Sequence, residues 1–252
     1  MWHIVNRIIL AAAIVLVTNV AMADIFGTGA NQFTINFMPI SGATNPTSGY
    51  GIVNNDYRMG TYEITNDQWD KFMDNLGVQV TGSDEGYHYS SAFTGTIMPT
   101  DNVSWYEAAQ FVNWLNTSTG NQVAYKFTGT QGTSNYTFAA WSATNTGYDA
   151  DNPYRNKDAK YYLPTENEWV KAAYWNGTTL QTYATKAGES LTQGNGVSGM
   201  GWNYYNNGYA TNPPGPWNVG SGSQELNGTY DMMGNNFEWL ESPFFSSDYG
   251  AS

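Results

Sequence analysis

Residues 229–239, TYDMMGNNFEW, bring oxygen donors and large aromatic side chains together around one glycine. Four of the side chains carry oxygen atoms that a hard cation accepts as ligands: Asp231, Asn235, Asn236 and Glu238. Gly234 permits turn angles that a side chain would forbid, so neighbouring carbonyl and carboxylate oxygens can converge on an ion such as Ca²⁺. A polar turn between two buried strands has the same composition, and the segment alone fits either interpretation.

Side chains for other kinds of catalysis are scarce. The chain has no cysteine and only two histidines, which excludes paired-thiol chemistry, a three-histidine iron site and zinc-finger geometry. His88 lies in a polar segment with Asp84 and Glu85, where a solvated loop histidine is far more common than a catalytic one. Carboxylate pairs suited to glycoside hydrolysis are numerous, but no motif singles one out. We therefore predict no catalytic residue.

Three capping boxes predict where the helices that position these residues begin. In each box a hydroxyl side chain is followed three residues later by Gln or Glu, and both side chains bind backbone amides of the first turn. The pairs are Thr65 with Gln68, Ser104 with Glu107, and Thr165 with Glu168. Apolar residues continue at helical spacing from Trp69, Trp105 and Trp169, and at this spacing a tryptophan is more typical of a core than of a ligand platform.

The strands are predicted to be few and short. Apolar residues alternate with polar ones in two places, around Phe33, Ile35 and Phe37 and around Val123, Tyr125 and Phe127. Residues 128–160 and 188–228 are rich in Asn, Thr, Gly, Asp and Pro, which favours irregular backbone.

The first 23 residues are typical of a secretory signal peptide. Arg7 supplies the positive charge, residues 8–20 are apolar, and Ala21-Met22-Ala23 has the small-x-small pattern of a cleavage site. The alternative is a membrane anchor, but the apolar run is shorter than the roughly 20 residues that a span requires. We expect cleavage of residues 1–23, no membrane span in the mature chain, and a secreted, periplasmic or cell-surface location for residues 24–252.

Composition favours one acidic domain. With 252 residues, 41% of them hydrophobic and 16% aromatic, the chain can bury one sizeable core, and 27 glycines indicate many loops. Removal of Arg7 leaves 8 basic against 21 acidic residues, a net charge of −13. Such a surface repels nucleic acid and anionic lipid and attracts cations. Without cysteine there is no disulfide, so stability must come from packing and bound metal.

Four motifs occur in the order seen in the sulfatase-modifying-factor family. They are GTYEITNDQWDKF (60–72), NVSWYEAAQFVNWL (102–115), YYLPTENEW (161–169) and YDMMGNNFEW (230–239). Over residues 50–242 the chain resembles the formylglycine-generating enzyme and its relatives. The resemblance implies an α+β fold of the irregular, loop-rich, C-type-lectin-like kind.

The resemblance also implies a metal site. Family members bind Ca²⁺ through turn carbonyls and a glutamate in the segment that corresponds here to Gly234, Asn235, Asn236 and Glu238. Asn236 replaces a small apolar residue, which a ligand acting through its backbone carbonyl tolerates. A second family site would use Asn203 and the carbonyl of Tyr204, but the acid that it also needs is missing from the following TNPPGPWNVG.

The enzymes of this family hold copper with two of their own cysteines near the C-terminus. This chain has no counterpart of them, so neither copper nor the oxidation of a sulfatase cysteine is expected. The family pattern continues past the EW motif into an arginine-glycine-glycine-serine segment and an arginine-rich strand. This C-terminal part of the pattern is missing before Ser252.

Three functions follow as expectations. The first is a non-catalytic, calcium-stabilised binding or structural protein with a protein or glycan ligand. The second is a fragment of a formylglycine-generating oxidase. The third is a carbohydrate-binding module that stacks sugars on loop aromatics, for which the candidates are Trp202, Tyr204, Tyr205 and Trp217.

Overall fold

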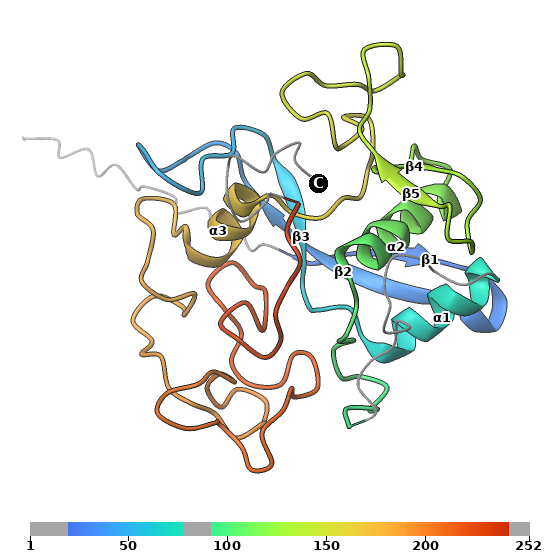
Figure 1. The fold of residues 1–252 in the computed structure, drawn as a ribbon. Coiled ribbons are helices and arrows are strands. Elements are labelled where there is room, and N and C mark those ends of the chain that lie inside the picture. The colour runs from blue at the N-terminus through green and yellow to red at the C-terminus, as the bar shows by residue number, and fades with distance from the viewer. Residues whose placement is uncertain (1–19, 78–91, 242–252) are drawn as a thin grey trace, which may run out of the picture.

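The computed structural model describes residues 20–77 and 92–241, so Asp84, Glu85 and His88 lie outside the described residues. The elements run in the order β1 (Met22–Phe26), η1 (Gly29–Asn31), β2 (Phe33–Ile40), β3 (Tyr57–Gly60), α1 (Asn66–Leu76), α2 (Trp105–Ser118), β4 (Lys126–Thr128), β5 (Thr137–Ala139) and α3 (Glu166–Tyr174). Helices α1 and α2 lie against the β1–β2 end of the main sheet, and α3 lies near β3 (Figure 1). The arrangement is the irregular, loop-rich α+β fold that was predicted.

The main sheet is an antiparallel meander in the order β1-β2-β3. Its register pairs Phe26 with Phe33 and Phe37 with Gly60. The alternation predicted around Phe33 corresponds to β2, where Phe33 and Ile35 are buried on one face. Strand β3 is the edge of this sheet, and its short sequence, YRMG, does not alternate clearly enough to have been predicted.

All three predicted capping boxes are present. Thr65, Ser104 and Thr165 each accept a hydrogen bond from the backbone amide three residues on, and the Gln or Glu side chain there binds back. These reciprocal bonds satisfy amides that a helix start otherwise leaves without partners. The helices therefore begin where the sequence predicted.

Aromatic packing between the sheet, α1 and α2 makes the larger of two cores. Phe72 is fully buried, and its ring meets Phe111 edge to face at a centroid distance of 5.1 Å. Trp69 is 2% exposed and contacts both Phe111 and Phe72, as predicted for a core residue. A smaller core joins Ile40 and Tyr57 to α3 and to Met232.

The second predicted strand is only partly right. Strand β4 covers Phe127, whereas Val123 and the fully buried Tyr125 precede it. Its partner β5 lies in the stretch that was predicted to be irregular, where Phe138 pairs with Phe127. Three-residue strands are stabilised by this pairing and by aromatic contacts rather than by a local pattern.

From Trp175 to Glu241 the chain is irregular, as predicted for residues 188–228. This part forms the large looped region below α3 in Figure 1. Its folding onto the rest of the protein depends on side chains that bind backbone groups. Asn227, for example, donates to Ala172 O at 2.8 Å and to Trp175 O at 3.1 Å, which satisfies carbonyls at the end of α3.

Strand β1 overlaps the end of the predicted signal peptide. Met22 and Ala23 pair with Phe37 and Asn36, so cleavage after Ala23 would remove two residues of the strand and leave Asp24 as the first. Asp24 accepts a hydrogen bond from Tyr161 Oη at 2.8 Å and forms an ion pair with Arg58. Within residues 20–77 and 92–241, no helix has the length and apolar character needed to cross a membrane.

Candidate functional site

The 229–239 loop is anchored at its start to the segment that follows β3. Tyr230 N donates to Thr61 O at 3.0 Å, and Asp231 Oδ2 accepts from Gly220 N at 2.8 Å. Asp231 and Asn235 both have positive φ, of 70° and 63°. Asparagine and aspartate tolerate this conformation better than most residues, which explains their place in a tight loop.

Gly234 is required by a close approach of two backbones. Its φ is 148°, and a Cβ atom at this position would lie 2.2 Å from the carbonyl oxygen of Asn203. The same oxygen accepts a hydrogen bond from Asn235 N at 2.8 Å. The glycine therefore allows the loop to dock on residue 203, which is a structural reason for the motif independent of any metal.

The side chain of Asn235 joins three segments. Its Oδ1 accepts from Asn203 Nδ2 at 2.9 Å and from Trp217 N at 2.6 Å. Its Nδ2 donates to Glu63 Oε2 at 2.7 Å. Asn203 and Asn235, predicted as ligands of two different ions, thus contact each other directly.

The other predicted ligands have different neighbours. Asn236 N donates to Glu63 Oε1 at 3.1 Å, and Tyr204 O accepts from Gln193 Nε2 at 2.7 Å. Glu238 accepts a hydrogen bond from the indole of Trp169. The structure therefore brings Gly234, Asn235, Asn236 and Asn203 together, and directs Glu238 toward α3.

Three carboxyl groups gather around this loop. Burial raises the pKa of Glu63 well above its usual range, and the charges of Asp231 and Glu238 raise it further. Burial also raises the pKa of Asp231 to about 6 and that of Glu238 to about 7. The ion pairs of the described residues include none of the three. These carboxyl groups therefore lie close together without an ion-pair partner among the described residues, and their raised pKa values favour proton binding.

This donor set has the hard-oxygen chemistry that Ca²⁺ prefers, but the side chains would have to exchange partners to bind it. Asn235 Oδ1 already accepts two hydrogen bonds, and one oxygen of Glu238 is engaged by Trp169. Across the described ranges, no group of three or more acidic, histidine or cysteine side chains is arranged to hold a metal. A calcium site in this loop would therefore depend on backbone carbonyls together with one carboxylate.

An open cavity of about 640 Å³ lies beside the loop. All four residues of β3 line it, together with α2, residues 157–164 and residues 236–239. Glu63 and Glu238 are its acidic groups near the loop. Glu238 is solvent-accessible because it faces this cavity, although protein atoms surround it, which accounts for its raised pKa.

Aromatic side chains line the acidic end of the cavity. Trp169 is only partly buried: it packs against the smaller core, as predicted, and also lines the cavity and donates to Glu238. Phe237 is fully exposed, and Trp239 is 51% exposed although its indole donates to Val103 O at 2.6 Å. Tyr162 lines the cavity further along and lies under the guanidinium of Arg155 at 3.9 Å.

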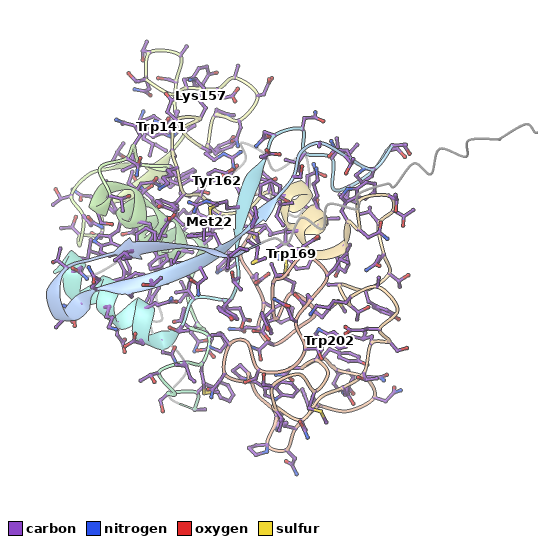
Figure 2. All side chains as sticks on the ribbon, turned by 180° about the vertical axis from the view of Figure 1, so that it is seen from behind. Met22, Trp141, Lys157, Tyr162, Trp169 and Trp202 are labelled. Atoms are coloured by element: carbon purple, nitrogen blue, oxygen red, sulfur yellow. The ribbon has the colours of Figure 1, made fainter. Side chains whose placement is uncertain are left out.

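The loop tryptophans proposed for sugar stacking are buried. Trp202 is 5% exposed and Trp217 is 7% exposed, so neither ring offers a free face, and this part of the carbohydrate interpretation was wrong. Trp202 lies within the irregular loops (Figure 2). Tyr205 is 67% exposed and packs edge to face on Tyr209.

Two functional features were missed at the sequence level. Glu63 was part of a recognised motif, but its role as the partner of Asn235 and Asn236 required the fold. Arg155 places Nη1 3.6 Å from both Glu168 and Glu241, and thereby links the start of α3 to the segment after the EW motif. Basic residues in a polar loop gave no sequence signal for this contact.

Comparison with known proteins identifies the family. The model of the sulfatase-modifying factor enzyme 1-like domain matches residues 26–251. The chain belongs to this family. The match extends beyond the four motifs, from the last residue of β1 onward, and covers the described residues from Phe26 to Glu241.

The chain is also similar to solved structures. Treponema denticola variable protein 1 aligns with a TM-score of 0.54 and 24% identity, over 88% of this chain and 77% of that chain. CarF aligns with a TM-score of 0.48 and 19% identity, over 82% of this chain and 80% of that chain. No curated protein matches the chain. At 24% identity, the likeness to the Treponema denticola protein shows the fold and not the activity.

Proposed function

We propose that this member of the sulfatase-modifying-factor family is an exported, non-catalytic binding protein, stabilised by calcium, whose ligand occupies the cavity between β3 and the 236–239 segment. The observation that carries the proposal is the cavity itself. A volume of about 640 Å³ is within the range of small-molecule sites, and the cavity combines apolar walls with acidic residues that include Glu63 and Glu238.

The wall chemistry favours a ligand with an aromatic or apolar body and an ammonium group. Glu238 supplies negative charge above pH 7, Glu63 adds a second carboxyl group whose raised pKa favours the protonated form, and neither belongs to an ion pair of the described residues. Trp169 and Trp239 supply aromatic surface that attracts cations. Ammonium groups occur on small amines, amino sugars and lysine side chains. The proposal therefore includes both protein and glycan ligands.

Matched aromatic probes test this proposal. Above pH 7, where Glu238 is ionised, phenethylamine should quench the tryptophan fluorescence of the full chain and bind at least about tenfold more tightly than 3-phenylpropionic acid, a difference of about 1.4 kcal/mol. Glu238→Gln should remove the preference, whereas Glu189→Gln, an exposed acid outside the cavity, should keep it. Equal affinity for the two probes, or no binding of either, would contradict the proposal.

The non-catalytic part rests on chemistry. Activation of oxygen toward a thiol needs a thiolate-bound or histidine-bound metal or a redox cofactor, and this chain has no cysteine. Folded protein incubated with copper, oxygen and a cysteine peptide should leave the peptide mass unchanged. Conversion of the cysteine to an aldehyde, seen by mass spectrometry above a protein-free control, would restore the oxidase interpretation.

Export rests on the signal-like N-terminus. Sequencing of secreted material should begin at Asp24. Recovery of the intact chain from membranes would contradict it.

A further inference from the structure

Lys171 is an unusual lysine, because its side chain on α3 is completely buried. Lysine is almost never fully buried unless its ammonium group has dedicated partners. Here Nζ donates to Asn45 Oδ1 at 2.8 Å and to Val53 O at 2.7 Å. Desolvation lowers the pKa of Lys171, against an opposing effect of Asp56, and so favours the neutral, nucleophilic amine.

Hydrogen bonds orient the carboxamide of Asn45 and polarise its carbonyl group for attack by an amine. Its Oδ1 also accepts from Val53 N at 2.8 Å, so two N–H donors polarise the carbonyl. Its Nδ2 donates to Asn54 Oδ1 at 3.0 Å and to Gly42 O at 3.3 Å, which orients the nitrogen away from the lysine. The amine and the amide are therefore in contact and oriented, and the lysine is shielded from water although Asn45 is partly exposed.

A second lysine–asparagine pair differs from this one because its lysine is partly exposed to solvent. Lys126 Nζ donates to Asn145 Oδ1 at 3.1 Å near the β4–β5 hairpin. Both residues there are partly solvent-exposed. An ammonium group that keeps its hydration stays protonated and does not attack an amide.

We propose that Lys171 and Asn45 become joined by an intramolecular isopeptide bond. Nζ attacks Cγ of Asn45, and the negative charge that develops on Oδ1 is stabilised by the N–H of Val53. The bond from Cγ to Nδ2 then breaks, and ammonia leaves with the proton that Nζ gives up. One amine and one primary amide yield one secondary amide and one ammonia, without an oxidant or a cofactor.

Such a bond would tie the loop before β3 to α3. It would close a long loop of the chain in a protein that has no cysteine and so cannot form disulfides. A cross-link of this kind stabilises mainly by restricting the unfolded state. It would also survive in a reducing environment, because no redox step makes or breaks it.

Mass spectrometry of the purified full chain tests the proposal. The denatured protein should be lighter than its sequence mass by about 17 daltons, the mass of one ammonia. Asparagine–glycine pairs such as Asn195-Gly196 can lose ammonia by cyclisation, so the intact mass alone does not decide. The deciding result is a branched peptide, with two N-termini, that contains both Asn45 and Lys171.

Variants distinguish the isopeptide bond from a hydrogen bond between the same two side chains. Lys171→Arg and Asn45→Ala should abolish the branched peptide and lower the melting temperature, whereas Lys126→Arg should leave the branched peptide intact. If a Lys171 variant fails to fold, the wild-type digest still decides. Linear peptides carrying unmodified Asn45 and Lys171, at full yield from folded wild-type protein, would overturn the proposal.

Discussion

At the scale of single residues, the 229–239 loop is an assembly point rather than an isolated turn. Asn235 alone connects the segment after β3, through Glu63, with residues 203 and 217. These contacts span up to 172 positions of sequence separation. The polar residues that indicated a cation site in this loop are therefore also those needed to join buried segments by hydrogen bonds. Every buried donor and acceptor there needs a partner.

Gly234→Ala should destabilise the protein by about 3 kcal/mol or more, because the added Cβ meets Asn203 O and the backbone angle suits glycine alone. Urea denaturation measures the change. Gly199→Ala is the matched control: its φ is also positive, at 78°, but a Cβ there has open space, so the cost should be about 1–2 kcal/mol. Equal losses in the two variants would contradict the close approach.

Glu225 is a buried acid outside the cavity. It is fully buried and accepts hydrogen bonds from Met233 N at 2.9 Å, Met232 N at 3.2 Å and the Thr229 hydroxyl at 3.2 Å. Burial nevertheless raises its pKa to about 8, since the backbone donors only partly offset the loss of water. The stability of the segment before the 229–239 loop is therefore expected to depend on pH.

Between pH 4.5 and 8 the folded chain holds a proton on Glu225 that the unfolded chain releases. Its contribution to stability is full below this range and is lost as the pH rises through it. Glu225→Gln should therefore reduce the decline in unfolding free energy by up to about 1.4 kcal/mol per pH unit. Denaturation curves at several pH values, with Glu189→Gln as the control, measure this. Parallel pH profiles for Glu225→Gln and wild type would show that Glu225 is ionised in the fold.

At the scale of elements, helix α3 contacts several segments that are far apart in the sequence. Its capping box orients Glu168 toward Arg155, Trp169 faces the cavity, and Lys171 reaches the loop before β3. Asn227 satisfies carbonyls at its C-terminal end. A helix of nine residues is too short to be stable alone, so these tertiary contacts support it as much as its own sequence does.

Thr165→Ala should destabilise the fold by about 1 kcal/mol, because the amide of Glu168 loses its side-chain acceptor. Thr165→Ser retains the hydroxyl and should cost much less. Thermal and urea unfolding of both variants measure the difference. Indistinguishable stabilities would mean that water replaces the cap without cost.

At the scale of the whole molecule, two features dominate: an acidic surface and a chain without cysteine. Apolar packing stabilises the half of the protein that contains α1 and α2. Hydrogen bonds between polar side chains, such as Asn235 and Glu63, stabilise the irregular half that ends in the EW motif. The carboxyl groups around Asn235 repel one another in this junction. A bound cation would relieve that repulsion, which is the physical basis for proposing calcium here.

Calcium at about 100 times its dissociation constant should raise the free energy of unfolding by roughly 2.7 kcal/mol if it binds only the folded chain. Chelation should therefore lower the melting temperature, and Glu238→Gln should abolish the response. Glu189→Gln should respond as wild type does. If calcium does not change the melting temperature of the wild-type protein, the proposed calcium binding is contradicted.

The elements that the sequence predicted are those whose signal is local. Capping boxes and helical spacing located α1, α2 and α3, because the residues that start a helix lie within one turn of each other. Strand β2 was likewise visible in its own alternation. Strands β3 and β5 were missed because their stability comes from partners elsewhere in the chain.

By itself, the sequence determined the family resemblance, the fold class, the helix starts and the absence of thiol chemistry, since motifs, caps and composition are properties of neighbouring residues or of the chain as a whole. Only the tertiary structure decided that Trp202 and Trp217 are buried, that Trp169 faces a cavity, and that Glu63 meets Asn235. Exposure and contact depend on which distant segments fold over a residue, and no local pattern encodes that.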